Sequence, residues 1–335
     1  MILLHKFYVD MLECPKCHGS LTWEITEESE DRIINAKIIC SCCGADYEVR
    51  DEIGVFLTPD LPRNDLWAQS ESELNRFFNE NPKIKEDFFS MPEEELNGAD
   101  YWFKASYYEM NKDYEKSSAM FKKAMPKIYT KDYIDGWNSQ IDYVVSMAEK
   151  SNCPIVDIAS GKGYLIELLL KNTDNYILGT DFSPVILLRD KNYFTSRGLY
   201  NKLSLIAFDG RRTPFKNNSI ELMTSNMGIQ NIEHPGKVIE EMNRICKNTF
   251  LSIMMLFKEE DKIHLDFMAK YGNISYMTEA TSLKTFNEEN WTCSLINKVK
   301  ANIEPTPVGK IIEMGIDGLP LENTTVDFCI MNCKK

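Results

Sequence analysis

Two pairs of cysteines near the start of the chain have the residue type and spacing of a metal site. Cys14 and Cys17 form one C-x-x-C pair, Cys40 and Cys43 form a second, and a glycine follows each pair closely. In such a pair the chain turns tightly enough for backbone amides to point at the thiolates, and four thiolates complete the tetrahedral shell that Zn²⁺ prefers. The spacing therefore predicts a closed, structural zinc site with these four ligands.

Two neighbouring residues suit this site less well. His18 follows Cys17 directly and cannot readily join the same turn, and Cys42 is expected to point elsewhere. The first fourteen residues lack a signal-peptide pattern, so we expect a cytoplasmic protein whose paired cysteines bind metal rather than form disulfides. The alternative is that these cysteines are simply free or buried.

A second group of residues lies where an apolar run ends in small residues. The sequence IVDIASGKGYL contains Asp157, Ser160, Gly161 and Gly163. Glycines let a backbone approach a ligand closely at the start of a helix, which is the layout of nucleotide-type cofactor sites. Ile166 stands where a dinucleotide fingerprint needs its third glycine, so NAD is the weaker interpretation.

Polar residues also end the next three apolar runs. Asp181 can accept hydrogen bonds from the two hydroxyls of a ribose, and Asp209 can accept one from the amine of an adenine. Asn226 ends the fourth run as a polar exit. Each residue has a second interpretation, because aspartates at strand ends often cap helices and asparagine often shapes a turn.

In this order, the four features resemble class I S-adenosylmethionine-dependent methyltransferases over about residues 130–335, and the stretch 214–247 resembles the ubiquinone and menaquinone biosynthesis subgroup. The resemblance implies an α/β fold with a Rossmann-like, seven-stranded sheet that holds S-adenosylmethionine at the carboxyl ends of its strands. It implies that the loop glycines pack against the methionine part of the cofactor and that Asn226 lies beside the sulfonium. The cofactor-binding residues expected from it are Asp157, Ser160, Gly161, Gly163, Asp181, Phe182, Asp209, Gly210, Asn226 and Met227.

The cysteine-rich stretch 11–57 resembles the small zinc-ribbon proteins that activate tRNA, rRNA and release-factor methyltransferases. The resemblance implies a ribbon that binds a protein partner or presents a substrate, here fused to the catalytic part. Glu52 stands where many relatives have glycine, so the partner surface of those relatives is not transferred to this chain.

Methyl transfer needs no dedicated catalytic residue, because the methyl group of a sulfonium is already activated and positioning can supply most of the catalysis. Glu233 and His234 follow the fourth apolar run and are candidate bases, although a histidine before proline more often belongs to a turn or cap. The sequence patterns for cytosine C5 methylation around Cys293 and for amino-group methylation after Ser225 are both missing.

The elements that must position these residues follow an alternation of strands and helices. From Cys153 onwards, short apolar runs alternate with helical ones, which predicts β-α-β units and a mostly parallel sheet. Helices are predicted over 114–124 and 132–150, and the chain after Ile303 is expected to return as closing strands. The predicted domains are a zinc ribbon (1–60), a helical linker (61–130) and a methyltransferase domain (131–335), with 258–302 as a cap or insertion near the acceptor.

Composition and charge exclude several classes of protein. The chain has 335 residues, 43% of them apolar and 27% charged, as in globular proteins rather than disordered or fibrous ones. The longest apolar run, Phe250–Phe257, is too short to cross a bilayer, so no membrane contact is expected. The net charge of −13 belongs to residues 1–100, which carry 22 acidic and 9 basic side chains. A long basic footprint is missing, and this weighs against strong, autonomous RNA binding.

The sequence leaves the acceptor open among a small molecule, RNA and protein. The stretch 214–247 favours a small molecule, whereas the ribbon favours RNA or protein. The alternative to an enzyme is a non-catalytic binding or regulatory module built on the same fold. The presence of Gly161, Gly163, Asp181 and Asp209 favours the enzyme, because a decayed cofactor pocket would be expected to lose some of them.

Overall fold

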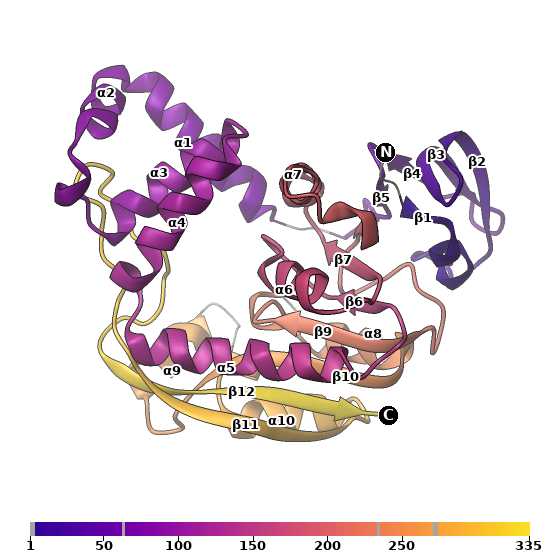
Figure 1. Ribbon diagram of the computed structural model, residues 1–335. Coiled ribbons are helices and arrows are strands. Elements are labelled where there is room, and N and C mark those ends of the chain that lie inside the picture. Colours follow the sequence, from indigo (N-terminus) through magenta and orange to yellow (C-terminus); the bar gives the residue numbers. More distant parts are fainter. Residues whose placement is uncertain (1–3, 62–63, 233–234, 271–273) are drawn as a thin grey trace.

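The computed structural model describes residues 4–61, 64–232, 235–270 and 274–335, and one sheet runs through them (Figure 1). The main part of this sheet has the strand order β8-β7-β6-β9-β10-β12-β11. Strands β8 to β10 are parallel, and β12 lies antiparallel between β10 and β11. The bounds are β6 Ile155–Asp157, β7 Ile177–Asp181, β8 Leu203–Ala207, β9 Ile220–Asn226, β10 Cys246–Phe257, β11 Thr292–Ile303 and β12 Thr324–Lys334.

The order of the strands reverses between β6 and β9. From β6 the chain adds β7 and β8 on one side, and it then returns to add β9 and β10 on the other side. The loops that leave neighbouring strands diverge at such a point, and the crevice between them is where open α/β sheets bind ligands. The residues expected to hold the cofactor follow β6, β7, β8 and β9, so the topology gathers them at this end of the sheet.

Helices cover both faces of the parallel strands, as the alternating pattern predicted. Residues such as Ile141, Leu165 and Leu187 from α5, α6 and α7 form one core with the strands. Val238 of α8 and Phe286 of α10 belong to the core on the other face. The bounds are α5 Lys131–Ala148, α6 Tyr164–Asn172, α7 Pro184–Ser196, α8 Pro235–Ile245, α9 Lys262–Lys270 and α10 Glu279–Glu288.

The cysteine-rich segment forms a small antiparallel sheet that continues the large one. Its last strand, β5, pairs in parallel with β8, and the amide of Phe56 donates to the carbonyl oxygen of Ala207 at 2.8 Å. Glu13 ties the segment to α8 through an ion pair of 2.9 Å with Arg244. The bounds are β1 Leu4–His5, β2 Leu21–Glu28, β3 Arg32–Cys40, β4 Asp46–Arg50 and β5 Ile53–Val55.

Four helices between the cysteine-rich segment and α5 form a lobe with apolar clusters of its own (Figure 1). Asn97 and Asp100 cap α3 by exchanging hydrogen bonds with each other's backbone amides, and Asp113 caps α4. The expected end of α4 before Pro126 is wrong by one turn, because Ile128 is buried and its packing outweighs the backbone bond lost at the proline. The bounds are α1 Leu66–Glu80, α2 Pro82–Ser90, α3 Gly98–Met110 and α4 Tyr114–Ile128.

The closing strands begin earlier in the chain than expected. Strand β11 starts at Thr292 inside the segment expected to be a cap, and residues 304–323 are a long loop rather than a strand. This loop reaches the lobe, where the carboxylate of Asp100 accepts from the amide of Lys310 at 2.9 Å and Ile312 joins the apolar cluster. The lobe and the loop therefore form one unit above the ends of β9 and β10.

Within the described part of the chain, we find no helix that combines the length and apolar character needed to cross a membrane.

Candidate functional site

The loop between β6 and α6 needs glycine at two positions. Gly161 and Gly163 both have positive φ values, +52° and +66°, which side chains rarely tolerate. A Cβ atom on Gly163 would lie 2.8 Å from the ring of Phe194, and one on Gly161 would lie 3.2 Å from the ring of Trp67. The loop thus needs glycine at both positions, because positive φ and the neighbouring rings leave no room for side chains there.

Asp181 connects this loop to the next strand. One carboxylate oxygen accepts from the amide of Gly161 at 3.0 Å, and the other accepts from the amide of Ser183 at 3.1 Å. Ser160 adds a second link, because its hydroxyl donates to the carbonyl of Thr180 at 3.1 Å. Burial raises the pKa of Asp181 to about 6, although these backbone donors act in the opposite direction. The carboxylate keeps lone pairs for a ligand, and Phe182 follows it directly.

Asp157 is a buried carboxyl at the end of β6. One of its oxygens accepts from the hydroxyl of Thr224 at 2.6 Å, and the other has no hydrogen-bond partner in the described structure. Burial, together with the charge of Asp181, raises the pKa of Asp157 to about 7. A buried oxygen without a partner is costly unless a ligand or a proton satisfies it.

The carboxylate of Asp209 is already engaged, which the sequence analysis did not foresee. It accepts from the Nε of Arg211 at 2.8 Å and from the Nη2 of Arg211 at 2.6 Å. Both side chains of this bidentate ion pair are largely buried. An adenine could approach only beside this pair or after it opens. The assignment of Asp209 and Gly210 to the adenine stays a prediction, and the arginine two residues on was the sequence signal that spoke against it.

The turn after β9 lies against the glycine loop. A Cβ atom on Gly228 would lie only 2.5 Å from the carbonyl oxygen of Ala159, so the two backbones touch. Met227 has a φ of +57° and donates its amide to the carbonyl of Ile253 at 3.0 Å. Asn226 points its amide oxygen at the indole nitrogen of Trp137, at 2.9 Å. The two candidate bases, Glu233 and His234, lie outside the described residues.

The four predicted zinc ligands come together in the structure. All of their sulfur atoms lie within 4.8 Å of one another, with 3.7 Å between Cys14 and Cys43 and 3.5 Å between Cys17 and Cys40. A tetrahedral ion with bonds of about 2.3 Å to sulfur has ligands about 3.8 Å apart, so the cluster has the size that zinc requires. The amides of Cys43 and Cys42 lower the pKa of Cys40 to about 6 against the effect of burial, which favours the thiolate.

The two residues excluded from this cluster lie apart from it. His18 hydrogen-bonds to the carboxylate of Glu13 at 2.7 Å, and the exposed Cys42 is not among the clustered sulfurs. Gly19 allows the close packing of the two turns, since a Cβ atom there would lie 2.6 Å from the Cβ of Cys42. None of the ten cysteines is in a disulfide.

Residues 156–249 match the family model of a methyltransferase domain, and they include the glycine loop, Asp181 and Asn226. Over these residues, the chain has a methyltransferase domain. The order of the strands and the position of the glycine loop agree with that assignment.

Relatives and solved structures give further similarity to the methyltransferase domain. The ubiquinone/menaquinone biosynthesis C-methyltransferase UbiE of Methylococcus capsulatus is 24% identical over 123 residues, which is 36% of this chain and 48% of that protein. The chain thus spans about half the length of the curated relatives it matches. A putative methyltransferase from Bacillus halodurans aligns at a TM-score of 0.47 with 12% identity, over 59% of this chain and 99% of that one. The complex of the Haloferax volcanii Trm112 methyltransferase activator with a putative methyltransferase aligns at 0.41 with 16% identity, over 59% and 90%.

Several residues around the methyltransferase domain's glycine loop were missed by the sequence analysis. Trp137 of α5 stacks on Tyr164 at the start of α6, with 4.6 Å between ring centroids, and so covers the end of the loop. Trp67 of α1 covers Gly161 from the lobe. The sequence analysis placed Trp137 in a predicted helix (132–150) and Trp67 in the helical linker (61–130). Nothing in the spacing of either residue distinguished it from a tryptophan of the core.

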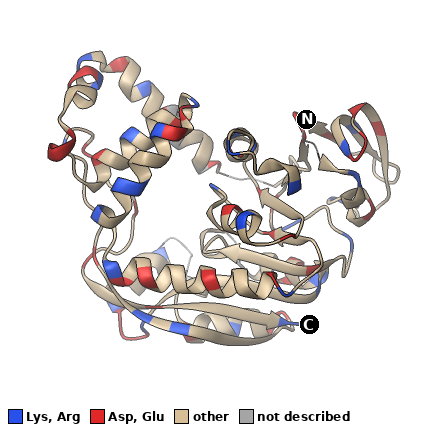
Figure 2. Ribbon diagram, in the orientation of Figure 1, with Lys and Arg blue, Asp and Glu red and all other residues tan. Residues whose placement is uncertain are grey.

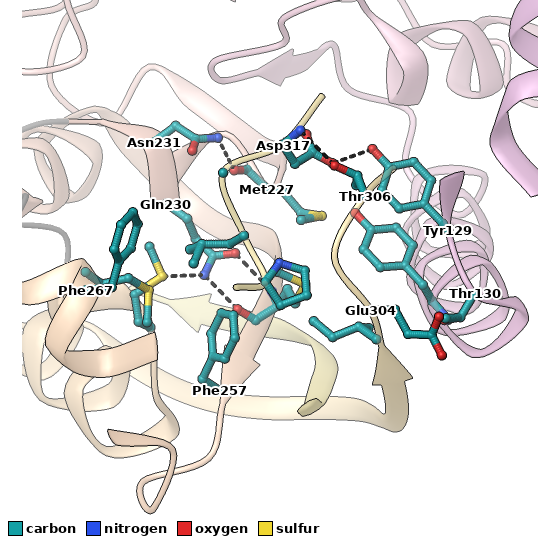
Figure 3. Close-up of a pocket in the computed structure, with 18 residues that line it drawn as sticks. Tyr129, Thr130, Met227, Gln230, Asn231, Phe257, Phe267, Glu304, Thr306 and Asp317 are labelled. Atoms are coloured by element: carbon teal, nitrogen blue, oxygen red, sulfur yellow. Dashed lines mark hydrogen bonds between the residues drawn. The ribbon is translucent and has the colours of Figure 1, made fainter. Parts of the chain in front are cut away.

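A cavity of about 450 Å³ opens beside Met227 (Figure 3). Its walls come from the ends of β10 and β11, the start of α5, α9 and the loop 304–323. Tyr129 donates its hydroxyl hydrogen to Asp317 at 2.7 Å at one side of this cavity. Asp317 as a residue is exposed, but protein atoms crowd its carboxylate, and this burial raises its pKa despite the bond from Tyr129.

Proposed function

We propose that this protein is an S-adenosylmethionine-dependent methyltransferase. The observation that carries the proposal is the pairing of Gly161 with Asp181 at the carboxyl ends of β6 and β7, within a stretch that matches a methyltransferase domain. The same crevice holds a glycine loop at a helix N-terminus and a carboxylate whose oxygens can accept further hydrogen bonds. These two groups can take a cofactor that carries both a ribose and an amino acid part.

The residues present fit this cofactor. Gly161 and Gly163 allow the loop to turn with positive φ at the start of α6, close to Trp67 and Phe194, and Asp181 can accept from ribose hydroxyls. One carboxylate oxygen of Asp157 has no hydrogen-bond partner, so it favours binding of a donor. The donor can be the ammonium group of the cofactor or a water molecule. Asn226 is fixed by Trp137, so the turn that ends in Met227 can serve as a rigid wall for the reacting groups.

When bound, S-adenosylmethionine supplies an activated methyl group: a lone pair of the acceptor bonds to the methyl carbon while the carbon–sulfur bond breaks and leaves its electron pair on sulfur. The chain's own task is to hold the two reactants in line and to exclude water. Positioning of this kind supplies much of the rate of such reactions, which agrees with the modest set of titratable groups beside Met227.

We propose that the four clustered cysteines hold a structural Zn²⁺. All four ligand positions are filled by the chain, so no position is left for a reacting water. Thiolates persist as metal ligands in a reducing compartment such as the cytoplasm, where we place the protein. A separate protein partner for this ribbon, as its relatives have, stays a prediction.

Calorimetric titration with S-adenosylmethionine tests the proposal. Asp181→Ala should weaken the affinity at least tenfold, because the substitution removes the acceptor for the ribose and releases Gly161. Asp174→Ala is the matched control, since Asp174 is fully exposed on the surface before β7 and should leave the affinity unchanged. Failure of the zinc-loaded, folded protein to bind the cofactor would reject the enzyme and favour a non-catalytic module.

A further inference from the structure

The cavity beside Met227 is lined mainly by apolar and aromatic groups. Four methionines face it, and Phe257 and Phe267 form the wall opposite Tyr129 and Asp317 (Figure 3). The buried Gln230 stiffens that wall, because its amide donates to the carbonyls of Met255 and Tyr276, at 2.9 Å each. A volume of about 450 Å³ accommodates a small organic molecule and falls within the usual range of ligand sites.

The charged side chains that line this cavity are all acidic. Asp317 and Glu304 are its two ionisable carboxyls, and no Lys, Arg or His is among its described lining residues. Tyr129 stacks on Tyr133 with 4.4 Å between ring centroids, so aromatic faces lie next to the carboxylate of Asp317. Aromatic faces, thioethers and carboxylates all favour a cation with an apolar body, and carboxylates repel an anion.

The cavity shares a wall with the proposed cofactor site. Met227 lines it, and the next residue, Gly228, touches Ala159 at the start of the glycine loop. The cavity and the proposed cofactor site therefore both border the turn 226–228. Within the proposed function, a molecule in the cavity lies next to the residues expected beside the sulfonium.

We propose that this cavity is the acceptor site and that the acceptor is a small amine with an apolar or aromatic body. The proposal stands on the chemistry of the cavity lining and does not use the amino-group methylation pattern, which is missing after Ser225. This inference rests on the proposed function and adds the class of substrate to it. The amine head lies toward Tyr129 and Asp317, and the apolar body lies among the methionines and phenylalanines.

The step balances for an amine. An ammonium gives a proton to the carboxylate of Asp317, the free nitrogen lone pair bonds to the methyl carbon, and the bond from that carbon to sulfur breaks with its electrons remaining on sulfur. The products are a methylated amine and the thioether S-adenosylhomocysteine. Asp317 then returns its proton to water, since the residue lies at the surface although protein atoms crowd its carboxylate.

RNA is the less favoured acceptor on the same observations. The cavity holds one small group rather than a strand, and its carboxyls would repel phosphates. The lobe beside it carries both signs of charge (Figure 2), although α4 has four lysines and one glutamate.

Ligand-observed NMR on the full chain tests the proposal with matched compounds. The probes are tryptamine, tryptophol and indole-3-acetate, which share one aromatic body and differ in the charge of the head, and the corresponding three phenyl compounds. The amines should bind at least tenfold more tightly than the carboxylates. Asp317→Asn should weaken the amines about tenfold. Glu313→Gln is the control, because Glu313 is exposed on the same loop and does not line the cavity.

Four results would overturn the assignment: no amine binds, the carboxylates bind as tightly as the amines, the two variants lose equal affinity, or only an RNA oligonucleotide binds. Thermal melts of both variants report that they fold. Cofactor affinity, measured by calorimetry on the same samples, separates the two proposals. Loss of amine binding with intact cofactor binding rejects this inference alone. Amine binding without cofactor binding rejects the proposed function, and with it the role of the cavity as an acceptor site.

Discussion

Lys162, which stands between the two glycines of the cofactor loop, forms an ion pair of 2.8 Å with Glu109 of α3. Glu109 is 9% exposed and also pairs with Arg189 of α7. The ammonium of Lys162 lies 4.8 Å from the ring centroid of Phe121 in α4. The lobe therefore holds the glycine loop by charge and by cation–π contact, and the loop's shape depends on helices that precede it by some fifty residues.

Replacement of Glu109 by glutamine should loosen this loop. The change leaves Lys162 and Arg189 without their shared carboxylate in a mostly buried place, which costs roughly 3 kcal/mol of stability. The affinity for S-adenosylmethionine should fall several-fold as well. Thermal unfolding and calorimetry measure the two effects, with the exposed Glu115→Gln on α4 as control. Unchanged cofactor affinity in a destabilised Glu109→Gln would show that the lobe supports only the fold.

The buried carboxyl of Asp157 should make stability depend on pH. Burial raises its pKa to about 7, so the folded protein keeps a proton that the unfolded chain releases near pH 4. Stability due to this group is therefore present below pH 4 and is lost as the pH rises toward 7. Between pH 5 and 8 the free energy of unfolding should fall by roughly 2 to 3 kcal/mol more in the wild type than in Asp157→Asn.

Urea unfolding at pH 5, 6.5 and 8 measures this difference. The exposed Asp10→Asn serves as control and should follow the wild type. An equal pH dependence in the wild type and in Asp157→Asn would mean that Asp157 is ionised in the folded protein over this range, for instance through a bound cation.

The zinc proposal makes opposite predictions for two cysteines, Cys17 and Cys42. Cys17→Ser should hold well under one zinc per chain and unfold at a lower temperature, because it removes one of four ligands that close the site. Cys42→Ser should keep one zinc per chain and the wild-type melting temperature, since its sulfur lies outside the cluster. Elemental analysis and thermal melts check both. Zinc loss in both variants alike would argue for a different ligand set.

Gly228 offers a steric test of the turn between the two spaces. In Gly228→Ala the new methyl group would lie 2.5 Å from the backbone oxygen of Ala159, so one of the two loops must move. We expect a loss of about 2 kcal/mol in stability and weaker binding of the cofactor. Gly315→Ala is the control for a glycine-to-alanine change without a clash, because a Cβ atom there would lie 3.9 Å from its nearest neighbour, the backbone oxygen of Asp317. Wild-type stability and cofactor affinity in Gly228→Ala would contradict this contact.

Local patterns predicted much of the fold. The alternation of apolar runs after Cys153 placed the five parallel strands and their helices, because buried strands and amphipathic helices each leave a short-range signature. The doubled C-x-x-C spacing placed the four clustered sulfurs for the same reason. The early start of β11 was missed because its alternation is weak: the first eight residues of this outer strand are all exposed or only partly buried.

Contacts between distant segments could not be predicted in this way. The ion pair between Glu109 and Lys162 and the attachment of the loop 304–323 to α3 join segments that have no common period in the sequence. The cavity was beyond prediction for the same reason, because its walls come from five separate elements. By contrast, the pairing of Asp209 with Arg211 could have been predicted, since the two residues lie two positions apart on one turn.

The pairing of β5 with β8 also bears on how the protein avoids aggregation. A sheet that ended at β8 would present a row of unpaired amides and carbonyls next to apolar side chains, which is a template for other chains. The cysteine-rich segment covers that row and moves the free edge outward to β2, where glutamates at positions 24, 27 and 28 discourage further pairing. The cysteine-rich segment therefore covers the edge of the methyltransferase sheet at β8, and we expect its loss to expose that edge to pairing between copies of the chain.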